Sequence, residues 1–276
     1  MTPRPASPAH RRLLLSLASE PCPFGCTYCF ADFSQYSPGL TLDEVEADPR
    51  LLDGVQVIYP ACDADLFVRR DAAEILIRTA AFRRSISIST KARVSPSHIE
   101  LLRRLNCELA DAGQLLKVGV SFSNRSRVAE IEPRTPTYGR RLETLSRLQH
   151  AGLPTIAVIR PLLADIDDAE YKALIADVAP FVIGVLMGDE YVDAQEDKRR
   201  DPRGIAAGPT GVRSRSVNWL ASPTLWPVRE TPGRIARLSA HARSLGLVAY
   251  TSDLQVMDSL LRQAVSGPGV LAARAS

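Results

Sequence analysis

Short apolar runs rich in β-branched residues recur along this chain, each separated from the next by room for one helix. Continuous apolar runs are typical of parallel strands covered on both faces, and their alternation with helices predicts βα units around a parallel sheet. The expected strands are Arg12–Leu17, Val55–Tyr59, Ser85–Ser89, Leu116–Phe122, Thr155–Ile159 and Val182–Met187, with Gly246–Ser252 as a candidate seventh.

Helical periodicity fills the intervals between these runs. Ser95 is a candidate N-cap followed by proline at the first helical position, and Gly152 is a natural helix stop. The stretch Asp193–Asn218 carries many charges and no clear period, so we expect a surface loop or a lid there. The expected helices are Asp71–Arg83, Pro96–Leu105, Arg140–Ala151, Asp168–Val178 and Pro232–Ser244.

Three cysteines, Cys22, Cys26 and Cys29, lie close together after the first expected strand, with the spacing C-x3-C-x2-C. Three thiolates so close can hold three corners of a [4Fe–4S] cluster and leave one iron open to a small molecule. A structural zinc usually takes four ligands in two pairs, whereas Cys62 and Cys107 stand alone. The odd count of 5 cysteines and the length of the chain argue against a disulfide framework.

Composition supports a cytoplasmic enzyme. The 276 residues suffice for an α/β barrel, and a hydrophobic content of 45% suffices for a sizeable core. The net charge of +3 is modest, so the chain lacks the strong basic bias that usually marks nucleic-acid binding. No apolar segment approaches the roughly 20 residues that span a bilayer, and no signal peptide is recognisable, so we expect no membrane contact.

The cysteine spacing, with Tyr28 before the last cysteine, resembles the signature of the radical S-adenosylmethionine (SAM) enzymes. This resemblance implies a partial (β/α)6 TIM-type barrel in the α/β class, with the active site at the carboxyl ends of the strands. It also implies a [4Fe–4S] cluster on the three cysteines and SAM on the open iron. Reductive cleavage of SAM would give a 5′-deoxyadenosyl radical that abstracts hydrogen from substrate. The electron would come from a partner such as flavodoxin or ferredoxin.

Within the superfamily, the run after the second strand resembles the Ala-Cys-x-x-Asp element of the spore photoproduct lyase-like enzymes through Ala61, Cys62 and Asp65. In the lyase, that cysteine returns a hydrogen atom to the product radical, which implies this role for Cys62. An S–H bond is weaker than most C–H bonds, so a carbon radical takes its hydrogen readily. In the superfamily this loop contacts the SAM amino group, so Asp63 and Asp65 are candidate cofactor residues. The alternative for Cys62 is a small buried core residue.

The resemblance assigns further SAM contacts to the ends of the third and fourth strands. Lys91 belongs to a Thr-Lys pair whose lysine reaches the SAM carboxylate in the lyase-like group, and an ammonium suits that point contact. The alternative is a solvated lysine at a strand end. Ser121 and Ser123 would offer hydroxyls to the SAM ribose.

Glu132 and Arg141 match a Glu-Pro element and an Arg-Leu pair of the related sequences. They could clamp each other or the SAM tail, and an ordinary loop-to-helix salt bridge explains them equally well. The resemblance also places the backbone at Ile159 and around Tyr28 against the adenine.

Two polar groups are candidates for the substrate wall. Asp189 and Glu190 follow the sixth expected strand and could bind sugar hydroxyls or an amine, although most charged side chains are simply solvated. Tyr250 and Asp253 follow the last expected strand and form the second candidate.

We expect one radical SAM domain over residues 1–276, with a core at about 12–190, an extension at 191–265 and a tail at 266–276. The leading functional hypothesis is an epimerase for a small polar metabolite, a sugar or nucleoside, with Cys62 returning the hydrogen. A DNA photoproduct lyase-type repair enzyme is the alternative, and an electron-transfer or iron-sensing protein is a third. The arginines that could contact DNA phosphates are Arg199, Arg200, Arg203, Arg213 and Arg215.

Overall fold

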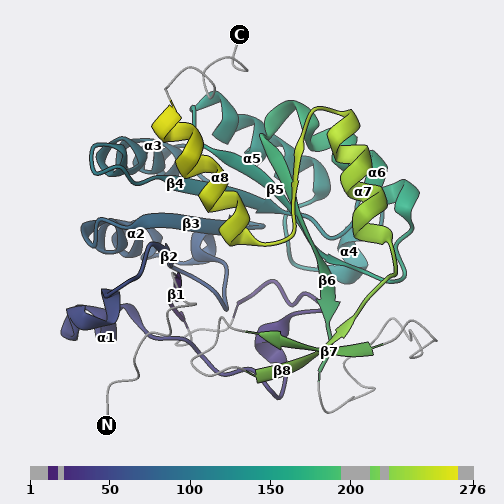
Figure 1. The fold of residues 1–276 in the computed structure, drawn as a ribbon, viewed down its shortest axis with the longest axis horizontal. Helices are drawn as coiled ribbons and strands as arrows, with labels where there is room; N and C mark the ends of the chain where they lie inside the picture. Colours follow the sequence, from purple (N-terminus) through teal and green to yellow (C-terminus); the bar gives the residue numbers. More distant parts are fainter. Residues whose placement is uncertain (1–11, 18–21, 194–211, 218–223, 267–276) are drawn as a thin grey trace.

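The computed structural model describes residues 12–17, 22–193, 212–217 and 224–266 (Figure 1). Its centre is a curled sheet of parallel strands in chain order, to which β9 adds by pairing in parallel with β6. The partial TIM-type barrel and the candidate seventh strand are therefore confirmed. The strands are β1 (Arg12–Leu14), β2 (Val57–Tyr59), β3 (Ser85–Thr90), β4 (Leu116–Ser121), β5 (Thr155–Leu162), β6 (Gly184–Tyr191) and β9 (Val248–Tyr250).

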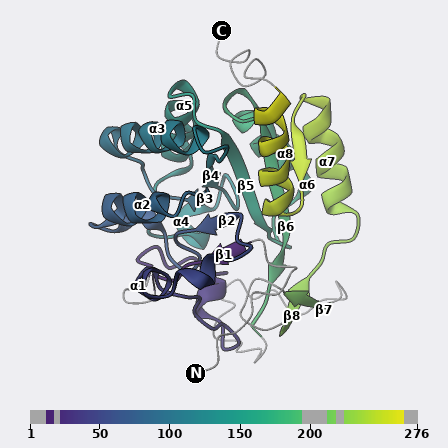
Figure 2. The ribbon, with the colours of Figure 1, turned by 60° about the vertical axis from the view of Figure 1, so that its left-hand side comes forward.

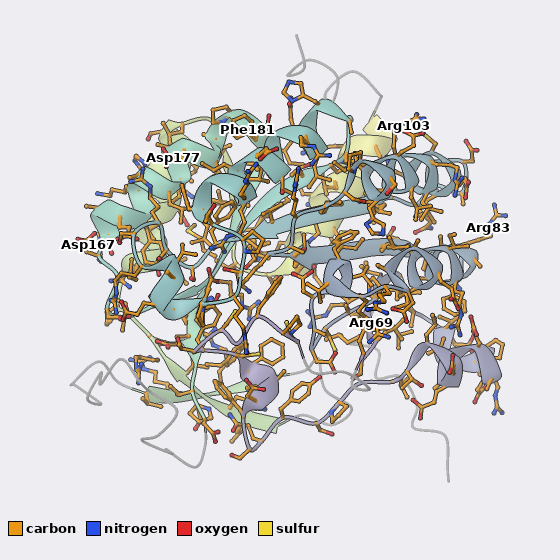
Figure 3. The ribbon with its side chains drawn as sticks, turned by 180° about the vertical axis from the view of Figure 1, so that it is seen from behind. Arg69, Arg83, Arg103, Asp167, Asp177 and Phe181 are labelled. Atoms are coloured by element: carbon orange, nitrogen blue, oxygen red, sulfur yellow. The ribbon has the colours of Figure 1, made fainter. Side chains whose placement is uncertain are left out.

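An outer layer of helices covers the convex face of this sheet, as the view from behind shows (Figure 3). Every second strand residue, such as Ile86, Val118 and Val185, points into the core beneath these helices and is fully buried. The expected helices are all present, and α3 runs five residues past its expected end at Leu105. They are α2 (Ala72–Ala81), α3 (Pro96–Ala110), α5 (Tyr138–His150), α6 (Asp168–Val178) and α7 (Arg234–Ser244).

A further helix, α8 (Asp253–Ser266), covers the concave face of the sheet, opposite α2 and α3 (Figure 2). Val256, Met257 and Leu260 of α8 pack in a second cluster with strand residues that include Ile156 and Leu186. We did not predict α8, although its buried apolar residues recur at helical spacing. The inside of the half-barrel is thus partly filled by a helix from the carboxyl end of the described chain.

A hairpin of β7 (Val212–Val217) and β8 (Thr224–Arg229) lies beyond the end of β6, to which β8 pairs antiparallel. The expectation of an irregular loop over Asp193–Asn218 is therefore wrong for β7, while residues 194–211 lie outside the described part. The β7 sequence Val-Arg-Ser-Arg-Ser-Val is mostly exposed, so it lacks the apolar run by which the other strands were found.

The strands also differ from expectation in length. β5 and β6 run on to Leu162 and Tyr191, so Asp189 and Glu190 lie within β6 and do not follow it. Two short helices, α1 (Leu42–Ala47) and α4 (Val128–Ile131), were not predicted. None of the helices in the described ranges is both long and apolar enough to cross a membrane. Short 3-10 turns complete the described structure: η1 (Phe30–Asp32), η2 (Pro49–Leu52), η3 (Leu66–Val68) and η4 (Ala179–Phe181).

Candidate active site at the mouth of the half-barrel

The cysteine loop is held in place by its backbone. The amide of Cys29 donates to the carbonyl of Cys26 at 3.1 Å, and the amide of Thr27 donates to the carbonyl of Ile131 at 3.0 Å. Gly25 has a φ of +60°, and a Cβ there would collide with the guanidinium of Arg134. The positive φ therefore favours glycine at this turn, and any side chain there would also have to displace Arg134.

The donor set of the loop fits an iron–sulfur cluster. Cys22, Cys26 and Cys29 are free thiols with partial exposure. Burial raises the pKa of Cys26 to about 12, against the opposing charge of Lys91, and burial also raises the pKa of Cys29. The thiols of Cys26 and Cys29 therefore keep their protons until a metal displaces them. Within the described residues, no three His, Cys, Asp or Glu side chains gather as they would around a single metal ion. A cluster instead takes one cysteine on each iron.

Beside the loop, a line of contacts joins four of the predicted SAM residues to the fourth strand. The ammonium of Lys91 lies 5.6 Å from the ring centre of Tyr28, whose hydroxyl donates to Glu132. Glu132 pairs with Arg141 at 2.6 Å, and both side chains are fully buried. Arg141 also donates to the carbonyl of Ser121 at 2.9 Å. The predicted clamp between Glu132 and Arg141 is present, as a buried ion pair that supports Tyr28.

Asp65 lies beneath the turn that carries Lys91. Its buried carboxylate accepts from the hydroxyl of Thr90 at 2.8 Å and from the amide of Lys91 at 2.6 Å. Further donors are the amides of Phe67 and Ala92. This carboxylate is occupied by protein donors, so its geometry suits holding the turn after β3 in place.

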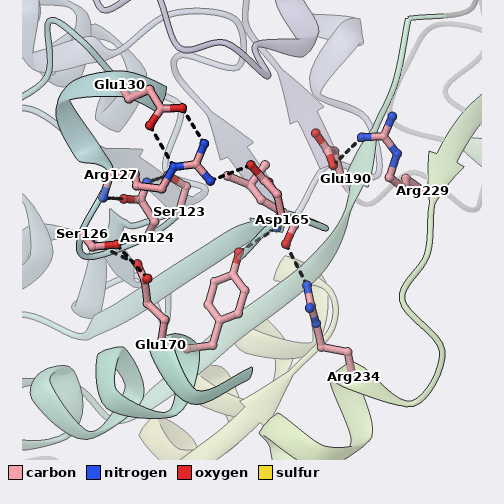
Figure 4. A network of polar contacts seen from close by, with 12 residues as sticks. Ser123, Asn124, Ser126, Arg127, Glu130, Asp165, Glu170, Glu190, Arg229 and Arg234 are labelled. Carbon is pink, nitrogen blue, oxygen red and sulfur yellow. Dashed lines mark hydrogen bonds and ion pairs between the residues drawn. The ribbon is translucent and has the colours of Figure 1, made fainter. Parts of the chain in front are cut away.

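The loops after β4 and β5 are tied together close to the predicted ribose contact (Figure 4). Ser123 is fully buried and accepts from the side chain of Asn124 at 2.9 Å. Asn124 in turn accepts from the amide of Arg127, whose guanidinium donates to Asp165 at 2.9 Å. The side chain of Ile159 is fully buried in the outer core, which leaves only its backbone for a cofactor.

Cys62 lies just after β2, and its amide donates to the carbonyl of Leu15 at 3.0 Å. Its sulfur is 3.7 Å from the hydroxyl of Tyr36. Burial, with the charge of Asp63, raises the pKa of the Cys62 thiol to about 12, so the S–H bond persists at neutral pH. Asp63 accepts from the hydroxyl of Ser16 and from the amide of Leu17 at 2.9 Å, which joins this loop to the end of β1.

The two acids of β6 are paired with the hairpin. Asp189 accepts from Arg215 of β7 at 2.6 Å, and Glu190 accepts from Arg229 of β8 at 3.2 Å. Arg215 also pairs with Glu230 at 2.8 Å. These acids therefore fix the hairpin onto the end of β6.

The other two candidate wall residues lie with α8. Tyr250 packs in the cluster around α8 and donates to Ser259 at 3.1 Å. Asp253 accepts from Lys117 of β4 at 2.8 Å and from Ser87 of β3 at 2.7 Å. Asp253 and Lys117 form a polar layer inside the half-barrel. Tyr250 and Asp253 therefore do not share one wall with Asp189 and Glu190, which pair with the hairpin.

Sequence reasoning missed an aromatic cluster that joins the hairpin to the segment after Cys29. Trp226 of β8 is fully buried, and its ring centre lies 6.2 Å from both Phe30 and Phe33. Tyr191 packs on Trp226 edge to face at 5.4 Å, and Tyr36 packs on Phe30 at 5.7 Å. The spacing of three between Phe30, Phe33 and Tyr36 was the available signal.

Comparisons with known proteins agree with this geometry. The chain is 24% identical over 174 residues to the uncharacterized protein MJ0683 of Methanocaldococcus jannaschii, a match that spans 58% of this chain and 63% of that relative. A double mutant of spore photoproduct lyase with bound AdoMet and dinucleoside spore photoproduct has a TM-score of 0.60 at 14% identity, over 82% of this chain and 73% of the other.

A second solved structure shares the fold less extensively. Streptococcus suis SuiB bound to its precursor peptide SuiA has a TM-score of 0.50 at 13% identity, over 64% of this chain and 38% of that one. The family model described as the radical SAM superfamily matches residues 18–178, more than half of the chain. That superfamily uses a [4Fe–4S] cluster and SAM, for which the cysteine loop supplies suitable donors. The chain belongs to the radical SAM superfamily.

Proposed function

We propose that this enzyme removes a hydrogen atom from a small polar metabolite and that Cys62 returns one to the resulting radical. When the two transfers act on opposite faces of one carbon, the net reaction is epimerisation of a sugar or nucleoside. With cluster and SAM bound, the site would supply the radical chemistry that abstracts this hydrogen. Lys91 would hold the SAM carboxylate, and Tyr28 would line the adenine.

The main support for this proposal is that the thiol of Cys62 stays protonated. A hydrogen-atom donor must keep its proton, and burial together with Asp63 raises the pKa of this thiol to about 12. Its place after β2 is at the carboxyl ends of the strands, where barrel enzymes of this type bind substrate.

The transfer balances when one external electron is included. The S–H bond of Cys62 breaks as a C–H bond forms on the substrate radical, which leaves a sulfur-centred radical. One electron from a reducing partner of the flavodoxin or ferredoxin type and one proton from solvent restore the thiol. The hydroxyl of Tyr36 lies 3.7 Å from that sulfur.

DNA repair of the lyase type is the alternative, and the arginines do not favour it. Arg213 and Arg215 pair with Glu230 and Asp189, so these charges are already partly neutralised. Arg199, Arg200 and Arg203 lie outside the described residues. The likeness to spore photoproduct lyase is at 14% identity and concerns the fold.

The deciding experiment is anaerobic turnover in deuterated water with SAM, reductant and a panel of sugars and nucleosides, followed by mass spectrometry. The thiol of Cys62 exchanges with solvent, so an epimerised product should be one mass unit heavier and should form together with 5′-deoxyadenosine. The Cys62→Ala variant should still form 5′-deoxyadenosine and should lose the labelled product. Cys107→Ala is the matched control, because Cys107 is exposed on α3 and should change neither readout.

Two results would count against the epimerase. An equal yield of labelled product from Cys62→Ala would show that another group returns the hydrogen. Conversion of dinucleoside spore photoproduct, with no labelled sugar or nucleoside, would support the lyase alternative.

A further inference from the structure

We infer that Arg160 binds an anionic group of the substrate, a phosphate or a carboxylate, at the mouth of the half-barrel. This inference rests on the proposed function, because it names the chemical class of the molecule on which that site acts. It is carried by the position of Arg160, by its contacts and by the pairing of the neighbouring charges.

Arg160 points to the concave side of the sheet. β5 is irregular here, because its register to β6 shifts between Ile159 and Leu162, but the side chain of Arg160 lies against Gly188. Gly188 alternates on β6 with Leu186, which packs with α8 on the concave side. On β6, a Cβ at Gly188 would lie 2.9 Å from Nε of Arg160 and 3.0 Å from its Cδ. The side chain of Arg160 therefore passes across Gly188, in space that only glycine leaves free.

The aromatic cluster holds the guanidinium of Arg160. One nitrogen donates to the hydroxyl of Tyr191 at 3.1 Å, and the guanidinium carbon lies 5.5 Å from the centre of the Tyr191 ring. Tyr191 packs on Trp226, which packs on Phe30, the residue after Cys29. This line of contacts places Arg160 on the same mouth as the cysteine loop.

Arg160 differs from its charged neighbours because it has no acidic partner among the described residues. Arg215 and Arg229 neutralise Asp189 and Glu190 of the adjoining strand. The contacts of Arg160 are instead to an aromatic ring and a phenol, which leave most of its five N–H donors unused. A partly buried guanidinium with unused donors matches the planar oxygens of a carboxylate or phosphate.

The charged groups in the layer below Arg160 are already paired with each other. Lys117 is fully buried and engaged with Asp253, and Asp253 is also bonded to Ser87. Two further described cations lie beside the cysteine loop: Lys91, which the resemblance assigns to the SAM carboxylate, and Arg134, whose guanidinium lies against Gly25 of that loop. Of the described arginines on β5 to β8, Arg160 is thus the one without an acidic partner, and we assign it to the substrate.

The test is a binding measurement on the cluster-loaded protein with SAM, by anaerobic calorimetry, and it requires no turnover. The probes are glucose, glucose 6-phosphate and glucuronate, together with uridine and uridine 5′-monophosphate. At least one anionic probe should bind more tightly than its neutral counterpart. Arg160→Ala should weaken that binding about tenfold or more, the size expected for a charged hydrogen bond. Whether phosphate or carboxylate gives the larger loss identifies the anion.

Two further variants sharpen the test. Gly188→Ala should displace the side chain of Arg160 and give a smaller loss of affinity. Arg103→Ala removes one positive charge from the outer face of α3, far from the mouth, and should leave binding unchanged (Figure 3). Raised salt should weaken anion binding to the wild type more than to Arg160→Ala.

The inference is overturned if no anionic probe binds more tightly than its neutral counterpart, or if Arg160→Ala binds the anion as well as the wild type does. It can fail separately from the proposed function, because Cys62→Ala should bind the anion normally while losing labelled product. Anion binding through Arg160 without labelled product in deuterated water would leave the inference standing and overturn the epimerase.

Discussion

The two halves of the mouth differ in how far the ion pairs that hold them are buried, although the hairpin side also contains the buried pair Glu190–Arg229. On the cysteine side, formed by the loops after β1 to β4, the pair Glu132–Arg141 has no exposure at all and links Tyr28 to the barrel wall. On the hairpin side, formed by β6 to β8, Asp189 pairs with Arg215, whose side chain is 40% exposed. Buried pairs cost much when one partner is lost, whereas exposed pairs contribute little.

This difference indicates that the two sides of the mouth have different roles. The buried network holds the residues beside the cysteine loop in one arrangement, as a site that positions a reactive cofactor requires. The hairpin side is joined by the buried pair Glu190–Arg229, by the pair of Asp189 with the partly exposed Arg215 and by one aromatic cluster, so at Arg215 it can change with less loss of stability. The proposed substrate residue Arg160 belongs to this second side.

The largest effect should come from the cysteine loop. Cys26→Ala removes one of the three proposed cluster ligands, so the reconstituted protein should lose its brown colour and all SAM cleavage. Visible absorbance and the yield of 5′-deoxyadenosine measure the two losses. Retained SAM cleavage would refute the assignment of Cys26 as a cluster ligand. The comparison of a cofactor-binding side with a hairpin side would then lose its basis.

The next effect should come from the buried pair. Glu132→Gln leaves the guanidinium of Arg141 buried beside a neutral group and should lower the free energy of unfolding by about 3–5 kcal/mol. Glu130→Gln is the matched control, because Glu130 lies two residues away and its side chain is 56% exposed. Urea unfolding measures both, and equal losses would break the proposed contrast.

The ion pair of Lys117 and Asp253 inside the half-barrel should contribute less to stability as the pH falls. Burial alone would raise the pKa of Asp253, but the ammonium of Lys117 and the hydrogen bonds outweigh it and lower that pKa below the usual 3.8. The stabilisation is therefore present above the unfolded pKa and is lost as pH falls through the folded one. Asp253→Asn should cost about 1.5–3 kcal/mol at neutral pH. Urea unfolding should show this difference shrinking below pH 3.8, and a constant difference at all pH values would exclude ionisation as its source.

The smallest effect should come from the hairpin. Arg215→Met removes the partner of Asp189 and Glu230 and should cost about 0–1 kcal/mol, as exposed pairs usually do. Thermal unfolding at low and high salt measures it, and the small loss should diminish further in salt. A cost as large as that of Glu132→Gln would show that the two sides do not differ.

The sequence predicted the parallel strands, because buried strands leave continuous apolar runs, and it located the cysteine loop by its spacing. It also placed Glu132 and Arg141 as possible partners. It could not find β7, whose side chains are mostly exposed, or predict that Asp189 and Glu190 would pair with arginines of a distant hairpin. Arg160 was missed for a related reason, because its environment comes from Gly188 and Tyr191 on a neighbouring strand.

The position of α8 has a consequence for how enzymes of this shape can diversify. The depth of the space inside the half-barrel is set by one helix that comes after β9, whereas the cysteine loop lies near the start of the described chain. Re-registering α8 by one turn would move Asp253 by about 5.4 Å along the helix axis. The space inside the half-barrel could therefore be made deeper or shallower, in evolution or in the laboratory, without altering the cysteine loop or the other segments proposed to carry the radical chemistry.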